Sequence, residues 1–309
     1  MILRIGTRGS KLALWQSEWI KTQIEAAYPD VHVELVRIKT TGDKILDSSL
    51  SKIGGKGLFV KEIEEALLSK RVDLAVHSMK DVPVELPDRL SLCSYPKRHE
   101  PRDVLVSTSG AGLQELPKGA RVGTSSLRRA AQLLHQRPDL QVLSLRGNVD
   151  TRLGKLDRGD FDAVILAGAG LARLGFADRV TQYLDPEVML PAIGQGALGL
   201  EVRADDTRTI EMLAFLNDIG TEAAVKAERA FLKELEGGCQ VPIAAHATIE
   251  DVRLRLRGMV AELDGSKMVK SEAIGAPEQA HEVGIRLARE LLEAGAAEIL
   301  QRIYREEGF

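Results

Sequence analysis

The chain contains little cysteine, few aromatic residues and almost no excess of charge. Among 309 residues there are 2 cysteines, and phenylalanine, tryptophan and tyrosine together make up 4%. Cys93 and Cys239 are too few for a disulfide framework or for a four-thiolate metal site. The 42 lysines and arginines against 45 aspartates and glutamates leave a net charge of −3, which argues against a general nucleic-acid coat or a polybasic membrane anchor.

Paired histidines and long apolar runs are lacking as well. The 6 histidines are scattered, with no pair at helical ligand spacing, so we expect no Cys/His metal site. The N-terminus lacks the cationic-then-apolar pattern of a signal peptide, and the apolar stretch 188–200 is short and broken by Pro191. The sequence therefore predicts a cytoplasmic protein that binds neither a metal nor a membrane.

The composition provides for a core of full size, because 44% of the residues are hydrophobic. In the first 100 residues, strand and helix patterns alternate as in an α/β domain. Residues 2–5 and 31–38 predict strands, and residues 11–27 and 59–69 predict helices. Between them, residues 40–57 have no apolar period and predict a long loop.

From residue 101 the α/β pattern starts again, with a weak internal echo of the first part. The segment Ile5-Gly6-Thr7 runs from a predicted strand into a helix, and so does Val122-Gly123-Thr124. Residues 71–76 similarly resemble residues 160–165. Two α/β lobes built alike would place a cleft between them.

The last third of the chain has a different pattern. Residues 221–236 predict a helix that ends at Gly237-Gly238, a C-cap signal. Arginines alternate with apolar residues over 252–257, Asp264-Gly265 predicts a hairpin turn, and residues 277–307 predict a final helical segment. We expect a small α+β domain here.

Arginines gather where ligands bind in open α/β sheets, at strand ends, helix starts and the loops between them. They are Arg8, Arg128, Arg129, Arg146, Arg152 and Arg173. Hydroxyls at two predicted helix N-termini also suit an anion: Thr7, Ser10, Thr124, Ser125 and Ser126. Helix caps and solvated surface arginines explain any single member equally well. The group as a whole favours a cleft for a ligand that carries several carboxylates or phosphates.

Two further residues are candidates for chemistry. Asp81 follows a predicted strand beside Lys80 and is a candidate acid or base, although an aspartate in a turn near Pro83 is just as common. Cys239 follows two glycines, which suggests an exposed thiol, whereas an inert buried cysteine remains an equal alternative.

The chain resembles the porphobilinogen deaminase family over essentially its whole length. Seven motifs occur in the family's order: residues 6–16, 56–61, 77–83, 123–129, 145–152, 191–196 and 237–243. The resemblance implies two lobes like periplasmic binding proteins around a cleft, plus a small α+β C-terminal domain. Implied boundaries are 1–98 with a return segment at about 197–214 for the first lobe, 99–196 for the second, and 218–309 for the third domain.

The resemblance also implies an activity, that of a hydroxymethylbilane synthase. Such a transferase condenses four porphobilinogen molecules head to tail on a dipyrromethane cofactor joined by a thioether to Cys239. Ammonia is released at each addition, and hydrolysis then frees the linear tetrapyrrole hydroxymethylbilane for porphyrin and heme biosynthesis. Each pyrrole carries an acetate and a propionate, so the growing chain is a polyanion that needs guanidinium partners.

Site roles follow from the same resemblance. Asp81 would be the catalytic carboxylate, which stabilises the cation left when ammonia departs. Cofactor-binding residues would be Cys239, Lys80, Asp81, Thr124, Ser125, Ser126, Arg128, Arg129, Arg146 and Gly147. Substrate-binding residues would be Arg8, Ser10, Arg146, Arg152, Arg173 and Gln195, and a lid would use Lys52, Lys56 and Phe59. A monomer is implied.

Two other classes of protein fit the arginines and the cleft. One is a two-lobed anion-binding module, such as a solute receptor, and the other is a phosphate-handling transferase. The first does not explain the Gly-Gly-Cys sequence at Cys239, and neither would carry a covalent chromophore.

Overall fold

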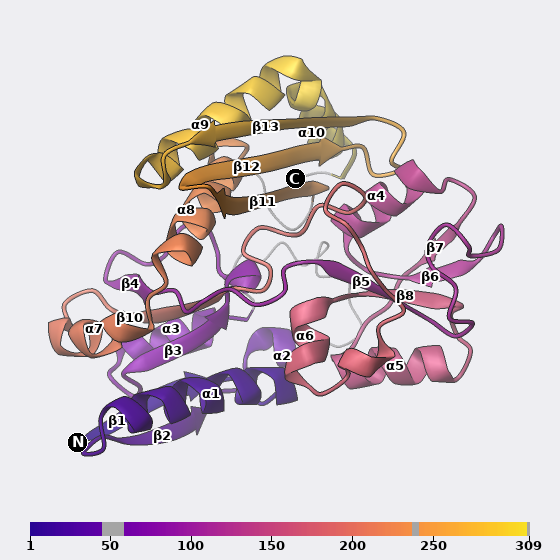
Figure 1. Ribbon diagram of the computed structural model, residues 1–309. Helices are drawn as coiled ribbons and strands as arrows, with labels where there is room; N and C mark the ends of the chain where they lie inside the picture. Colours follow the sequence, from indigo (N-terminus) through magenta and orange to yellow (C-terminus); the bar gives the residue numbers. More distant parts are fainter. Residues whose placement is uncertain (45–58, 237–240, 308–309) are drawn as a thin grey trace. The chain divides into compact units, whose positions relative to one another are not determined.

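A computed structural model describes residues 1–44, 59–236 and 241–307 of the chain (Figure 1). Lys52, Lys56 and Cys239 therefore lie outside the described residues. The chain divides into two compact units, one of residues Met1–His99 with Ala197–Glu222 and one of Glu100–Gly196 with Ala223–Phe309. The finer division of the second unit into a lobe and a C-terminal domain stays a prediction.

The first unit contains a five-stranded sheet in the order β2-β1-β3-β10-β4. Strands β1, β2 and β3 are parallel, and β10 runs antiparallel to both of its neighbours. The elements are β1 (Ile2–Thr7), α1 (Lys11–Ala27), β2 (His32–Arg37), α2 (Thr41–Lys44), α3 (Lys61–Leu68), β3 (Leu74–Ser78), η1 (Met79–Asp81), β4 (Leu90–Ser94), β10 (Leu198–Arg203), α7 (Thr207–Leu213) and η3 (Ala214–Leu216).

Helix α1 illustrates how the first unit is built. Ser10 caps its N-terminus, because the hydroxyl accepts a hydrogen bond from the backbone N–H of Ala13 at 3.3 Å. Ile20 and Ile24, one turn apart, are fully buried in one cluster with Leu3 of β1 and Val33 of β2. Burial of this apolar face, rather than helix propensity, holds α1 on the sheet.

The second unit begins with another five-stranded sheet, in the order β7-β6-β8-β5-β9. Its elements are β5 (Asp103–Ser107), β6 (Arg121–Gly123), α4 (Leu127–Gln136), β7 (Gln141–Leu143), α5 (Val149–Asp157), β8 (Ala163–Ala167), α6 (Gly168–Arg173), η2 (Ala177–Arg179) and β9 (Gln182–Tyr183). Here β6, β7 and β8 are parallel, while β5 runs antiparallel to β8 and β9.

The two sheets share one arrangement of strands, although the antiparallel strand β10 comes last along the chain in the first and its counterpart β5 comes first in the second. A matching ion pair marks equivalent positions in each. In the first unit, Arg4 on β1 contacts Asp73, which precedes β3, through its backbone N–H and two guanidinium nitrogens. In the second, Arg121 on β6 contacts Asp162, which precedes β8, through the same three groups. The sequence echo between residues 71–76 and 160–165 thus corresponds to a structural repeat.

The rest of the second unit is an antiparallel sheet in the order β11-β12-β13, and α9 lies along it (Figure 1). Its elements are α8 (Ile219–Glu234, of which the part from Ala223 belongs to this unit), β11 (Ile243–Glu250), β12 (Arg253–Ala261), β13 (Met268–Gly275), η4 (Pro277–Gln279), α9 (Ala280–Leu291), η5 (Leu292–Ala296) and α10 (Ala297–Glu307). Phe231 of α8 is fully buried in its core.

The predicted α/β class is confirmed, with two sheet-based lobes and a small α+β portion at the C-terminal end. Two local predictions need correction. Residues 41–44 of the predicted loop form a helical turn, and the final helical segment is interrupted at Gly295, whose φ is 105°. A positive φ suits glycine and ends the regular helix there.

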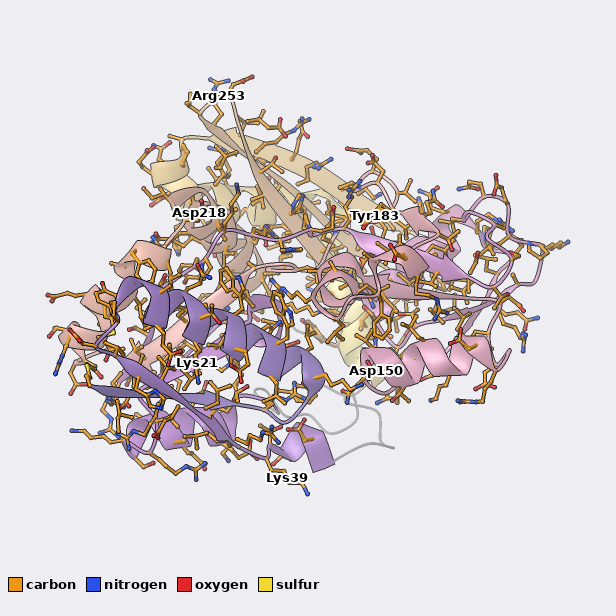
Figure 2. The ribbon with its side chains drawn as sticks, turned by 60° about the horizontal axis from the view of Figure 1, so that its bottom comes forward. Lys21, Lys39, Asp150, Tyr183, Asp218 and Arg253 are labelled. Atoms are coloured by element: carbon orange, nitrogen blue, oxygen red, sulfur yellow. The ribbon has the colours of Figure 1, made fainter. Side chains whose placement is uncertain are left out.

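Charged side chains of both signs cover the surface, such as Lys21 on α1, Asp150 on α5 and the exposed Arg253 on β12 (Figure 2). Within the described ranges, no helix has the length and apolar character to cross a membrane. The same residues include no group of three or more metal-ligating side chains arranged around one point.

Candidate functional site

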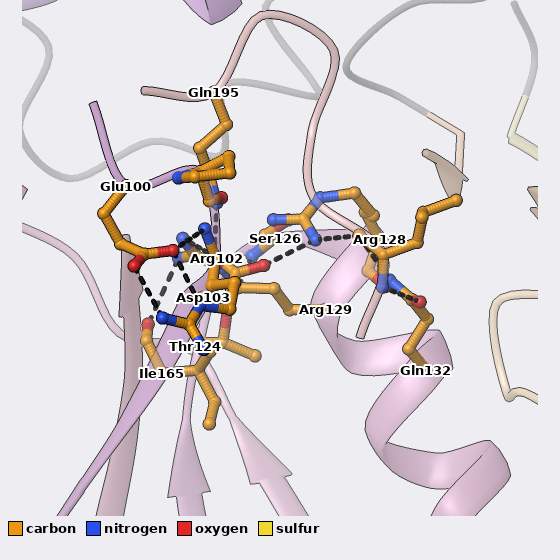
Figure 3. Close-up of polar contacts among 12 residues, drawn as sticks. Glu100, Arg102, Asp103, Thr124, Ser126, Arg128, Arg129, Gln132, Ile165 and Gln195 are labelled. Atoms are coloured by element: carbon orange, nitrogen blue, oxygen red, sulfur yellow. Dashed lines mark hydrogen bonds and ion pairs between the residues drawn. The ribbon is translucent and has the colours of Figure 1, made fainter. Parts of the chain in front are cut away.

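A buried carboxylate, Asp103, organises the arginines of the second unit (Figure 3). Asp103 opens β5, and its Oδ2 accepts a hydrogen bond from Nη1 of Arg128 at 2.7 Å. Its Oδ1 accepts from Nη2 and Nε of Arg129 at 2.6 and 2.9 Å, and from Nε2 of Gln195 at 3.0 Å. The cluster therefore joins the N-terminus of α4 to β5 and to the loop that carries Gln195.

The charges of this cluster do not cancel. Burial alone would raise the pKa of Asp103, but attraction by Arg128 and Arg129 and their hydrogen bonds outweigh it and hold that pKa well below its usual range. Burial also lowers the pKa of Arg128, although Asp103 opposes the shift. Two guanidinium groups face one carboxylate, so the cluster carries a net positive charge in a place shielded from water.

The two arginines differ in how much of their hydrogen-bonding capacity the protein uses. Arg129 donates from all three nitrogens, to Asp103 and, at 3.1 Å, to the carbonyl of Ile165. Arg128 donates only from Nη1, to Asp103 and to the carbonyl of Leu190 at 2.7 Å. Among the described residues, Nε and Nη2 of Arg128 have no hydrogen-bond acceptor, and these donors suit a ligand carboxylate.

Two other predicted arginines of this unit, Arg173 and Arg152, donate to backbone carbonyls. Arg173 is buried, which lowers the pKa of its guanidinium to about 10, and it donates to the carbonyl of Gly196 at 2.9 Å. Arg152 donates to the carbonyl of Gly147 at 2.7 Å, and the carbonyl of Arg146 accepts from a lysine on α5. Gly147 has a φ of 111°, and a Cβ there would lie 2.7 Å from Thr151, so the position requires glycine.

The hydroxyl-bearing residues predicted to bind an anion differ in the hydrogen bonds that they make. Ser10 caps α1, so the helix-cap explanation given above applies to it. Its hydroxyl can still donate its own proton to a further group. Ser126 precedes α4 without capping it through its side chain. Ser125 donates to the carbonyl of Leu145 at 2.8 Å, and the hydroxyl of Thr124 accepts from the backbone N–H of Ser126 at 3.2 Å.

In the first unit, Asp81 and Lys80 are exposed on η1, directly after β3. Asp81 makes no hydrogen bond or ion pair to any other described residue. The strand beneath is fixed by buried polar contacts, since His77 lies 2.8 Å from Glu201 of β10 and Ser78 accepts from Gln16 at 2.9 Å. Asp81 thus projects from a rigid support with its carboxylate available.

Arg8 and Phe59, predicted as a substrate ligand and a lid residue, are in contact. The guanidinium carbon of Arg8 lies 4.1 Å from the centre of the Phe59 ring, and the same group pairs with Asp43 at 2.6 Å.

Sequence reasoning found the arginines but missed their carboxylate partners, Asp43 and Asp103. A signal for Asp103 was present, because a charged first residue of an apolar strand such as Asp103–Ser107 must be paired when it is buried.

Two α/β lobes with one arrangement of strands, an α+β portion and a buried, net positive arginine cluster define the class: a multidomain α/β protein with a candidate site for anionic groups. Residues 3–211 match the family model of the porphobilinogen deaminase dipyrromethane cofactor binding domain, and residues 223–293 match that of the porphobilinogen deaminase C-terminal domain. The chain belongs to the porphobilinogen deaminase family.

Curated relatives support this over nearly the whole chain. A porphobilinogen deaminase of Syntrophobacter fumaroxidans is 57% identical, over 98% of this chain and 98% of its own length. One of Syntrophotalea carbinolica is 58% identical, over 96% of this chain and 95% of its own. The predicted family, transferase activity and dipyrromethane cofactor are thereby confirmed.

The chain is also similar in outline to solved structures of binding proteins. An ancestral cationic amino acid solute binding protein has a TM-score of 0.44 and 15% identity, covering 70% of this chain and 87% of that one. The periplasmic aliphatic sulphonate binding protein SsuA from Escherichia coli has a TM-score of 0.40 and 16% identity, covering 76% of this chain and 70% of that one.

Proposed function

We propose that the chain condenses four porphobilinogen molecules on a dipyrromethane cofactor attached to Cys239, with Asp81 as the catalytic carboxylate. The cofactor would be held by the predicted set of residues: Lys80, Asp81, Thr124, Ser125, Ser126, Arg128, Arg129, Arg146 and Gly147. Porphobilinogen and the growing chain would contact Arg8, Ser10, Arg146, Arg152, Arg173 and Gln195, and Lys52, Lys56 and Phe59 would form a lid. A cytoplasmic monomer that binds no nucleic acid is part of the proposal.

The donor set of the second unit fits such a cofactor. Two substituted pyrroles carry two carboxylates each, and the cluster around Asp103 is net positive with unused N–H groups on Arg128. When bound, a dipyrromethane supplies the nucleophilic pyrrole carbon on which the product grows. Arg128 would hold its carboxylates through these unused N–H groups, and Arg129 would add positive charge, in a buried place where charge-assisted hydrogen bonds are strong.

Of the two cysteines, only one is a plausible attachment point. Burial raises the pKa of Cys93 to about 12, so its thiol carries almost no thiolate at neutral pH. This leaves Cys239 as the nucleophile of the thioether bond.

One observation carries the role of Asp81. Asp43, Asp73, Asp103 and Asp162 each pair with an arginine, whereas Asp81 stands exposed after β3 without a partner among the described residues. An ionised carboxylate can face the pyrrole N–H of the substrate and stabilise the positive charge that develops as ammonia leaves. It can also move protons to the departing amine and from the attacked carbon.

Asp81→Asn tests this role. We expect the variant to keep its fold and its cofactor, measured by intact mass, and to lose turnover by about 100-fold or more because the fixed charge is gone. Asp88→Asn, at another exposed aspartate of the same unit, is the matched control and should turn over normally. Near-normal turnover of Asp81→Asn would remove Asp81 from the mechanism.

A further inference from the structure

Arg8 is held on one edge by a carboxylate that no sequence motif singled out. Asp43 Oδ1 accepts from both Nε and Nη2 of Arg8, at 3.1 and 2.6 Å. These two nitrogens form the side edge of the guanidinium group. The neighbouring end edge is formed by Nη1 and the second N–H of Nη2, and Nη1 donates no hydrogen bond within the described ranges of the chain.

Asp43 is itself fixed in place. Its second oxygen, Oδ2, accepts from the hydroxyl and the backbone N–H of Thr40, at 2.8 and 3.2 Å. Thr40 is fully buried, and the side chains of Arg8 and Asp43 are each 21% exposed. Hydrogen bonds from Arg8 and Thr40 overcome the effect of burial and lower the pKa of Asp43, so this carboxylate stays ionised at neutral pH.

Phe59 restricts the face of the same guanidinium group. Its ring lies against Arg8 and also against Gly42, where a Cβ would overlap the ring. Thr41 donates to Glu62 from its backbone N–H at 2.7 Å, which ties residues 40–43 to the start of α3. Among the described residues, Arg8 is therefore confined at one face and one edge, and its end edge is left for a further partner.

We propose that Asp43 is a positioning residue for substrate binding: it occupies the side edge of Arg8 and presents the end edge to a carboxylate of porphobilinogen. The inference rests on the proposed function, which assigns Arg8 to the substrate. An arginine without such a support loses side-chain entropy when it is immobilised by a ligand, and this loss weakens binding. Asp43 has already restricted this freedom, and the planar end edge matches a carboxylate in a bidentate pair.

The test is steady-state kinetics of the holoenzyme carrying Asp43→Asn. We expect KM for porphobilinogen to rise about tenfold while kcat stays within about twofold, because a substrate contact is weakened and Asp81 is untouched. Intact mass should show that cofactor loading is unchanged. Arg8→Gln should raise KM at least as much, and adding Asp43→Asn to it should raise KM no further, because Asp43 acts through Arg8.

The matched control is Asp73→Asn. Asp73 contacts Arg4 through the same side edge, with Nε at 3.1 Å, in the same unit and outside the candidate site. We expect its KM to equal that of the unmodified enzyme. If Asp73→Asn raises KM as Asp43→Asn does, the effect reflects the fold in general and the inference is wrong.

The substrate-binding role of Arg8 and the positioning role of Asp43 can be overturned separately. If Arg8→Gln leaves KM unchanged, Arg8 does not bind substrate and the proposed function loses that residue. If Arg8→Gln raises KM but Asp43→Asn does not, the positioning role alone is overturned. Should Asp43→Asn fail to fold, Thr40→Val provides the second variant, since it removes the hydroxyl that fixes Oδ2 and keeps the ion pair. It should raise KM by a smaller factor, and an unchanged KM there would also contradict the inference.

Discussion

Asp103 shows how a single buried side chain can hold several candidate site residues together. It is fully buried, and it satisfies the side edge of Arg129, one nitrogen of Arg128 and the amide of Gln195. Three of the predicted site residues thereby share one partner. Their relative positions are fixed by this shared partner, and such preorganisation would lower the cost of binding the proposed anionic ligand.

The pH dependence of the free energy of unfolding tests the pairing of Asp103 with the two arginines. The pKa of Asp103 is lowered in the folded state, so the pair stabilises the fold fully above the unfolded-state value of about 3.9 and less as the pH falls below it. Asp103→Asn should reduce the free energy of unfolding at pH 7 by about 3 to 5 kcal/mol, because two buried cations lose their counter-charge. Urea denaturation between pH 7 and pH 3 should show this difference shrinking on the acid side.

Asp162→Asn is the control for that series. Asp162 pairs with Arg121 in the same unit, but the two side chains are 38% and 41% exposed, so water replaces the lost contact. A much smaller loss is expected. Equal losses for the two variants would mean that burial of Asp103 gives it no special weight.

Sequence alone could single out the arginines proposed to bind a ligand, but not the carboxylates with which they pair. Arginines at strand ends and helix starts follow a known preference, whereas Asp43 and Asp103 act through contacts with residues 35 and 25 positions away in the chain. Such pairings depend on the tertiary fold, which local spacing does not specify.

At the scale of elements, glycines decide how closely α8 and α9 pack. A Cβ at Gly284 of α9 would overlap the backbone carbonyl of Ala227 and approach Ala230 at 2.8 Å, both on α8. Gly258 on β12 similarly leaves room for the Phe231 ring, which lies 2.7 Å from where its Cβ would be. Helices α8 and α9 can therefore pack closely because glycine has no side chain at their contact.

Two helical Gly→Ala substitutions should therefore change the free energy of unfolding in opposite directions. Gly284→Ala is expected to destabilise the fold by about 1 to 3 kcal/mol through overpacking. At Gly154 on α5 a Cβ would meet only Arg158 at 3.7 Å, so Gly154→Ala should stabilise by up to about 1 kcal/mol through helix propensity. Thermal unfolding of both variants measures the difference, and a stabilised Gly284→Ala would contradict the packing described here.

The helix Lys11–Ala27, which has strong periodicity, was predicted to the residue, and the strand predicted over 31–38 spans His32–Arg37. The break at Gly295 was missed because apolar residues continue on both sides of it. The edge strand Gln182–Tyr183 has too few residues to give a pattern, and pairing with β5 alone defines it.

At the scale of the whole molecule, the covalent cofactor can be tested by measuring the mass of the chain. Under denaturing conditions the purified chain should exceed 33.7 kDa by one dipyrromethane, and Cys239→Ser should not. The reason is that a thioether survives unfolding, whereas ionic contacts with Arg128 and Arg129 do not. A sample at the bare mass should gain the dipyrromethane when it is incubated with porphobilinogen, and no gain would contradict the attachment.

The place of β10 in the first sheet has a consequence for synthesis on the ribosome. Every strand of the second five-stranded sheet falls between Asp103 and Tyr183, so that sheet has its full set of strands first. The first sheet must wait for Leu198–Arg203, because β10 separates β3 from β4. The first four strands of the first sheet therefore leave the ribosomal exit tunnel early, but that sheet is completed late. During that interval it exposes unpaired strand edges, which favour aggregation of the nascent chain.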